Sequence, residues 1–244
     1  MHGKQPSEVP TLVQSLLALA DSPATVAVLQ EAELCDKAKR HLREGKYIAA
    51  LELVMPLAVS ENSLLADLAR DIAVFALDEI VDQYYEQGDY QKSIYYLEQW
   101  LTIEPKSLYA QIRKAEILWW EMEDAKEARR IYRAVAQRYP KCLEAWIGLA
   151  EIALHFEQYQ RAYSFLRRAW TALSNPEWAY PPTREIVANV LESLYVLTAR
   201  LLVKLGDTQN AKRILLQGVE RIGTVSSYVL EELHIVRQLL AKSE

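Results

Sequence analysis

The sequence contains few of the residues from which most enzyme and metal sites are built. Its 244 residues include seven glycines, four histidines and two cysteines. It has no phosphate-binding glycine loop, nucleophile elbow, Cys-x-x-Cys pair or zinc-binding His-Glu-x-x-His motif. Cys35 and Cys142 lie far apart within apolar helical patterns, which predicts two small buried thiols and no disulfide framework. We therefore expect a chain that is not an enzyme, holds no cofactor or metal and works in the reducing cytoplasm.

The chain also lacks long apolar runs and an excess of basic charge. Apolar residues make up 51% of it and charged residues 25%, which is typical of a folded globular protein. The nearest candidate for a membrane span, Thr11 to Ala20, has about half of the roughly 20 residues that a spanning helix needs, and no basic leader precedes it. The net charge of −5 disfavours a protein whose affinity comes from neutralising phosphates. We expect neither a membrane span nor secretion.

Three of the glycines mark turns between helical patterns. Gly45, Gly88 and Gly206 each follow one apolar helical pattern and precede another, which is typical of a helix-turn-helix repeat. A small residue recurs five positions after each glycine and in two repeats without it, where it allows two antiparallel helices to approach closely: Ala50, Ser93, Ala128, Ala162 and Ala211. A bulky residue follows four positions later on the same helical face: Val54, Leu97, Tyr132, Leu166 and Leu215.

These signals divide the chain into helix pairs at 31–64, 74–107, 109–142, 143–176 and 192–225. The pattern resembles the tetratricopeptide repeat over about 31–225, most closely in Tyr84, Gly88-Asp89-Tyr90, Ser93, Trp100 and Pro105, and then in Trp146, Leu149-Ala150, Tyr159, Ala162 and Ala169. Two repeats depart from it, with Glu123-Asp124-Ala125 in place of the glycine turn and with Gly218 in place of a core alanine. The resemblance implies an all-α, right-handed helical-repeat solenoid of about five helix pairs.

The spacing breaks twice, and both ends of the array carry extra segments. The first break predicts one extended helix over about 63–87. The second predicts a loop at 173–183, whose Trp178 and Tyr180 either pack down or form a contact site, followed by a helix that starts near Thr183. We expect an N-terminal segment at 1–30 with a short helix, a helix over 23–43 and a C-terminal capping helix within 226–244.

The resemblance also implies which side chains line a concave groove. Carrying the groove positions of the first helices onto repeats two to four gives a surface rich in acid and in large apolar side chains: Phe75, Asp78, Asp82, Tyr85, Glu86, Arg113, Ile117, Trp120, Glu121, Glu144, Ile147, Glu151, His155 and Phe156. Such a surface suits a protein segment that bears Lys or Arg beside apolar anchors. We expect a non-catalytic adaptor, assembly factor or co-chaperone.

A second surface keeps an alternative open. Basic residues lie along the second helices of repeats three and four: Lys126, Arg129, Arg130, Arg133, Arg167 and Arg168. They suggest an anionic partner such as RNA or a lipid head group, whereas the interleaved Glu123, Asp124 and Glu127 suggest a solvated charged face. The apolar N-terminal helix additionally leaves a homo-oligomer open.

Overall fold

The computed structural model describes residues 23–223 and, beyond them, residues 230, 231, 234, 235, 238, 239 and 241, which are helical. The short helix expected within 1–30 and the rest of the expected capping helix lie outside the described residues. Within residues 23–223 the chain forms α-helices joined by short connections, with one isolated bridge between Cys142 and Glu177 and no strand. The prediction of an all-α helical-repeat fold is confirmed.

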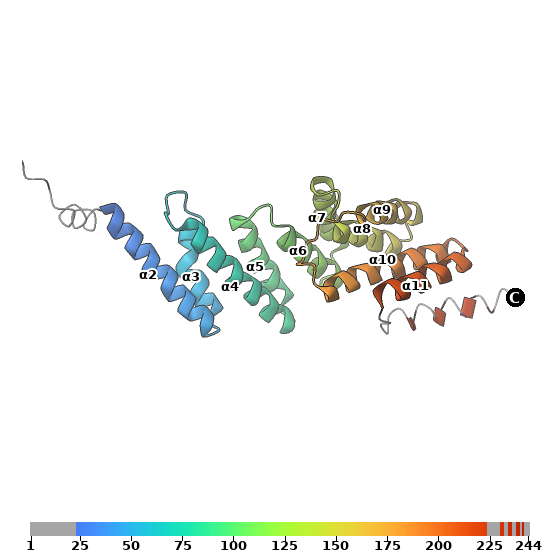
Figure 1. Cartoon of the computed structure of the whole chain (residues 1–244), viewed down its shortest axis with the longest axis horizontal. Helices are drawn as coiled ribbons and strands as arrows, with labels where there is room; N and C mark the ends of the chain where they lie inside the picture. The colour runs from blue at the N-terminus through green and yellow to red at the C-terminus, as the bar shows by residue number, and fades with distance from the viewer. Residues whose placement is uncertain (1–22, 224–229, 232–233, 236–237, 240, 242–244) are drawn as a thin grey trace, which may run out of the picture. The chain divides into compact units, whose positions relative to one another are not determined.

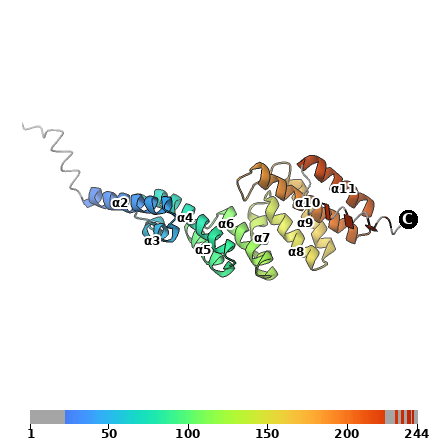
Figure 2. The ribbon, with the colours of Figure 1, turned by 90° about the horizontal axis from the view of Figure 1, so that it is seen from below.

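The chain forms two compact units, one up to Pro105 and the other from Lys106. In unit 1 each helix packs on the next in sequence: α2 (Pro23–Arg43), α3 (Tyr47–Ala58), α4 (Ala66–Glu86) and α5 (Tyr90–Ile103). Unit 2 contains three pairs (Figure 1): α6 (Leu108–Trp120) with α7 (Ala125–Arg138), α8 (Leu143–His155) with α9 (Tyr159–Ala172), and α10 (Arg184–Lys204) with α11 (Thr208–Ile222). In unit 2, α10 also packs against α8 and α9 (Figure 2).

The turns within the pairs share a left-handed residue. Gly45, Gly88 and Gly206 have φ values of 71°, 75° and 83°. The repeats without glycine reach the same region with Glu123, at φ 55°, and Glu157, at φ 54°. A residue with a Cβ pays a steric cost in this region. The two repeats without glycine therefore form the same turn, with a strained backbone at Glu123 and Glu157.

An aspartate after the left-handed residue begins three of the second helices. Asp89, Asp124 and Asp207 each accept a hydrogen bond from the backbone N–H three residues later, at 3.2, 3.0 and 3.2 Å. This bond satisfies one of the N–H groups that have no partner within the helix. Thr183 caps α10 in the same way, through the N–H of Ile186 at 3.2 Å. The helix expected near Thr183 is confirmed.

The small residues of the repeat lie in the core. All five are completely buried: Ala50, Ser93, Ala128, Ala162 and Ala211. Gly218, the departure in the last repeat, makes room for an aromatic ring, because a Cβ there would lie 2.8 Å from Cγ of Tyr195. The two cysteines are also buried and unpaired, as the sequence predicts.

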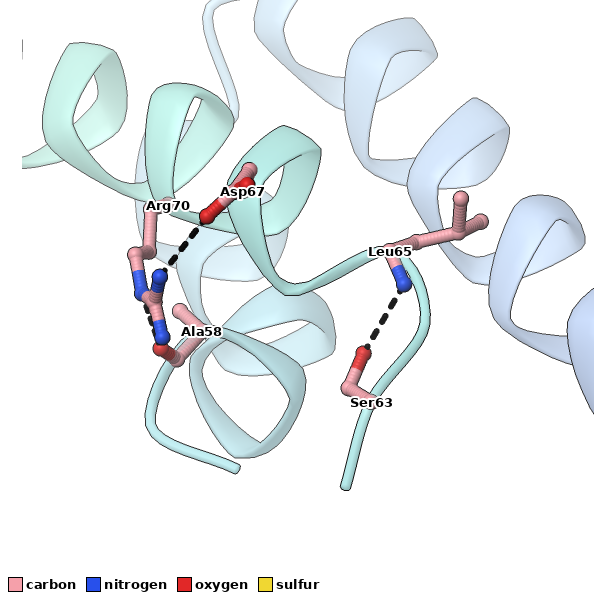
Figure 3. Close-up of polar contacts among 5 residues, drawn as sticks. All are labelled: Ala58, Ser63, Leu65, Asp67 and Arg70. Carbon is pink, nitrogen blue, oxygen red and sulfur yellow. Dashed lines mark hydrogen bonds and ion pairs between the residues drawn. The ribbon is translucent and has the colours of Figure 1, made fainter. Parts of the chain in front are cut away.

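The connection between α3 and α4 corrects one helix boundary. We expected the extended helix to begin near residue 63, whereas α4 begins at Ala66. The Leu65 N–H lies 3.3 Å from Ser63 Oγ (Figure 3) and 3.1 Å from Oε2 of Glu31 on α2, so these bonds take the place of a first helical turn. Arg70 closes the connection from the other side, since its Nε donates to the Ala58 carbonyl at 2.9 Å (Figure 3).

Helix α10 is more apolar than our reading of the sequence suggested. Its 21 residues have a mean hydropathy of 1.6 over an 18-residue window, so by length and composition alone it could cross a membrane. In the structure 39% of that window is buried, and Val196 and Ala199 pack against Ala211 and Leu215 of α11. Part of the apolar surface of α10 is thus buried within unit 2.

We predict that relieving the strained turn stabilises the chain. Glu157→Gly should raise the free energy of unfolding by about 0.5–1 kcal/mol, because glycine enters the left-handed region without the Cβ penalty. Gly88→Ala should lower it by about 1 kcal/mol through backbone strain, since a Cβ at Gly88 meets no atom within 4 Å. Urea denaturation measures both, and two unchanged stabilities would contradict the turn geometry.

Candidate binding site

The first helices of the three pairs in unit 2 surround a cavity of about 440 Å³. Helix α8 lies between α6 and α10, and the 173–183 loop reaches the same space. The lining combines four charged side chains with polar and apolar ones from α6, α7, α8, α10 and the loop: Arg113, Glu116, Trp120, Tyr132, Glu144, Ile147, Gly148, Glu151, Tyr180, Ile186, Asn189, Val190, Ser193 and Leu197.

Three carboxyl groups face this cavity against one guanidinium, that of Arg113. Glu144 and Glu151 stand seven residues apart on α8, which places them on one face two turns from each other. Burial raises the pKa of Glu116 and of Glu151 from 4.5 to about 7, because the ionised form loses hydration. Burial also raises the pKa of Glu144. Near neutral pH the cavity therefore holds acid that is only partly ionised.

The 173–183 loop packs down onto α6 and α8. The Tyr180 hydroxyl donates a hydrogen bond to Glu116 Oε2, and its ring meets that of Tyr109 edge-on with centroids 5.2 Å apart. The Ala179 N–H donates to Glu144 Oε1 at 3.0 Å. Of the two roles that the sequence left open for this loop, packing is the one that these contacts support. The loop thereby supplies hydrogen bonds to two of the three cavity carboxyl groups.

A second hollow of about 430 Å³ continues from the cavity. The two share Trp120, Glu151 and Leu197. The second hollow is more apolar, with walls of Trp119, Trp120, Glu151, Leu154, His155, Leu197, Arg200, Val203, Lys204 and Ile235. We call the cavity and this hollow together the unit 2 groove. Trp120 stands where they join and is 57% exposed, which is unusual for a side chain of its size.

Six of the groove residues expected from the sequence line the unit 2 groove: Arg113, Trp120, Glu144, Ile147, Glu151 and His155. The expectation is wrong for Ile117, which is 1% exposed on the core face of α6 that Ala110 and Leu118 also occupy. Its neighbour Glu116 takes the groove position. The expectation is also wrong for Phe156, the C-cap of α8, which lines a hollow along α7 because five residues of helical rotation turn it away from Glu151. Glu121 is half-buried and lines neither part of the groove.

The remaining expected residues lie on α4 and belong to unit 1. Phe75 is 51% exposed, Asp78 is half-buried, and Asp82 and Glu86 are exposed. Tyr85 packs against Tyr90 of α5 with ring centroids 5.5 Å apart. These five lie along one helix of unit 1, whereas all the residues of the unit 2 groove belong to unit 2.

Sequence reasoning missed the groove residues outside the first helices of repeats three and four. Asn189, Val190, Ser193 and Leu197 come from α10 and Tyr180 from the loop, and the sequence reasoning named none of them as groove residues. One signal was available in Gly148, a glycine within a helix. A Cβ there would lie 2.5 Å from the Tyr132 ring, so the glycine lets this ring reach the cavity.

Residues 120–180 match the family model of the tetratricopeptide repeat. The match spans α7 to α9, and in this segment the resemblance predicted from the sequence is confirmed. No curated protein matches the sequence. Among solved structures, an ArsTM double mutant of MamA from strain RS-1 is 19% identical, with a TM-score of 0.50, over 79% of this chain and 94% of that one.

Two further solved structures resemble the chain less. MamA from residue 41 onward, from Desulfovibrio magneticus RS-1, is 19% identical with a TM-score of 0.49, over 78% of this chain and 93% of that chain. The assembly chaperone of RpL4, Acl4, is 19% identical with a TM-score of 0.42, over 87% of this chain and 97% of that chain. At 19% identity, the likeness to the MamA double mutant shows a shared helical-repeat fold.

We predict that the buried carboxyl of Glu116 makes the fold less stable as the pH rises. Its pKa is raised in the folded chain, so folding retains a proton that the unfolded chain loses, and stability falls between pH 5 and pH 8. Glu116→Gln removes this loss. The free energy of unfolding of the variant, relative to that of the wild type, should therefore increase by about 2 kcal/mol between pH 5 and pH 8. Urea denaturation of both proteins at the two pH values measures it, and an equal effect at both would refute the shift.

Proposed function

We propose that the chain is a non-catalytic adaptor whose unit 2 groove holds a segment of a partner protein with Lys or Arg beside apolar side chains. The observation that carries the proposal is the combination, in one cavity, of three carboxyl groups against Arg113 with the apolar walls that end at Trp120. Tetratricopeptide repeats commonly bind protein partners, which supports an interaction role in general. The choice of a basic and apolar segment rests on the lining of the groove.

The charge of the groove favours a cationic side chain. Glu151 lines the cavity together with Glu116 and Glu144, so a lysine or arginine that enters from the cavity side approaches its carboxyl group, whereas Arg200 and Lys204 line the hollow on the other side. The positive charge favours the ionised form of Glu151 and offsets the desolvation that raises its pKa in the free protein. Binding of a cation therefore removes an electrostatic cost that the free chain carries.

The apolar part of the groove favours an anchor beside the charge. Trp120 contributes a large half-exposed ring, and Leu154, Leu197 and Val203 continue the apolar wall. Aromatic side chains in such positions often supply much of the affinity of an interface, because they bury a large area at little entropic cost. We place this adaptor in the cytoplasm, as an assembly factor or co-chaperone, a setting that suits its two free and buried thiols.

The proposal predicts the outcome of peptide selection. A random ten-residue phage library selected on the full chain should enrich Lys or Arg next to Leu, Phe or Trp, because these residues match the groove. Trp120→Ala should weaken the selected peptide about 30-fold, or about 2 kcal/mol, mainly through faster dissociation. Tyr163→Ala is the control, since Tyr163 is a comparably exposed aromatic on α9 outside the groove. The absence of Lys or Arg peptides among those selected, or equal losses in both variants, would refute the proposal.

The same peptide should bind more tightly as the pH rises. At pH 6 the carboxyl of Glu151, with a pKa of about 7, is mostly protonated, and at pH 8 it is mostly ionised. The affinity for a lysine-containing peptide should therefore increase about 5- to 10-fold between these values. Glu151→Gln should flatten this dependence, whereas Glu220→Gln, an exposed site on α11, should preserve it. Calorimetry at pH 6, 7 and 8 measures the affinities, and a dependence of the opposite sign would exclude a cation at Glu151.

A further inference from the structure

A basic hollow in unit 2 lies outside the groove, along α7 and the turn between α8 and α9. Its volume is about 710 Å³, and its lining contains four cationic side chains and no carboxylate: Ala125, Lys126, Arg129, Arg130, Arg133, Ala134, Gln137, Phe156 and Gln158. We call it the α7 hollow. It shares no residue with the unit 2 groove.

Only one of the four cations is held by a carboxylate. Arg130 donates to Glu127 at 2.7 Å from Nε. Within the described part of the chain, Lys126 and Arg133 form no ion pair, and both side chains are exposed. The guanidinium of Arg129 instead lies over the ring of Phe156, with its Cζ 5.5 Å from the ring centroid. A ring holds an arginine in place while leaving its full charge available to an anion.

The spacing of these cations matches an extended chain. Lys126, Arg129 and Arg133 follow one another at three and four residues, so they share one face of α7. Arg129 and Arg133 are separated by about 6 Å along the helix axis, since each residue rises about 1.5 Å. In an extended segment every second side chain points to the same side, with a repeat of about 6.6 Å. Carboxylates at alternate positions therefore meet successive arginines.

We propose that the α7 hollow binds an extended acidic segment of a partner protein, with Asp or Glu at alternate positions. Arg129 and Arg133 each face one carboxylate, and Lys126 extends the positive surface by one more turn. Arginine suits this role because its planar guanidinium pairs with a carboxylate through two hydrogen bonds. The Phe156 ring, which is 48% exposed, offers an apolar contact to the stem of the first acidic side chain.

The surroundings of the hollow favour a short acidic peptide over RNA. Exposed Glu123, Asp124 and Glu157 are neighbours in sequence of the lining residues at the beginning of α7 and in the turn before α9, and they repel a polyanion that continues past them. The hollow also presents a single aromatic ring, which Arg129 approaches, whereas single-stranded RNA sites stack successive bases on several rings.

Fluorescence anisotropy on the full chain tests the proposal with three labelled probes. The first is the peptide Gly-Glu-Ser-Glu-Ser-Glu-Gly, the second replaces each Glu with Gln, and the third is a uridine dodecamer. The test variant is Arg129→Glu with Arg133→Glu. The matched control is Lys212→Glu with Arg213→Glu, which reverses two exposed cations on the second helix of another pair. Circular dichroism checks that both keep their helix, and Arg129→Gln with Arg133→Gln replaces the test variant if it does not.

The proposal expects the Glu peptide to bind at least 10-fold more tightly than the Gln peptide. The test variant should lose at least 10-fold in affinity for it, and the control should stay within twofold. Trp120→Ala should leave this binding intact, so the result is independent of the groove. Equal losses in the test and control variants, or no preference for Glu over Gln, would overturn the proposal. Tighter binding of the uridine dodecamer that the test variant abolishes would overturn it in favour of RNA.

Discussion

The close crossing of paired helices is the constraint on which the rest of unit 2 depends. Ala128 and Ala162 are completely buried at their crossings, so the helix backbones approach with no larger side chain between them. Gly148 extends the same principle to the contact of α7 with α8, where any side chain would collide with the Tyr132 ring. Because Tyr132 fills that space, its ring also forms part of the cavity wall. The shape of the groove is therefore a consequence of core packing.

The buried carboxyl groups of the groove, which we propose to bind a partner, lower the stability of the fold when they are ionised. Burying Glu116, Glu144 and Glu151 around one cavity costs free energy whenever they ionise, as the direction of their pKa shifts shows. The 173–183 loop offsets part of this cost, since Tyr180 and the Ala179 N–H donate hydrogen bonds to two of the three groups. Glu151 receives no bond from the loop and lines both parts of the groove. It is the carboxyl best placed to meet an incoming cation.

The sequence predicted the helix pairs better than the groove because the two depend on contacts of different range. Left-handed turns, N-terminal caps and small crossing residues act over a few positions, so the helix over 23–43 and the start of α10 were predictable. Which residues face the groove depends on the rotation of each helix about its axis. An error of one position in that rotation led the sequence to predict Ile117 where the structure has Glu116. The contact between Tyr180 and Glu116 spans 64 positions, and no periodic pattern encodes it.

The misplacement of Phe156 also shows how unit 2 keeps opposite charges on neighbouring surfaces. The ring centroids of Trp119 and His155 are 5.1 Å apart, and those of His155 and Phe156 are 4.9 Å apart. The guanidinium of Arg129 lies over the ring of Phe156. Aromatic rings therefore join the apolar part of the unit 2 groove to the basic α7 hollow. A salt bridge at this boundary would cancel one charge from each side, whereas the ring of Phe156 attracts Arg129 through its quadrupole and neutralises nothing. Both surfaces consequently retain the charge that a partner of opposite sign would recognise.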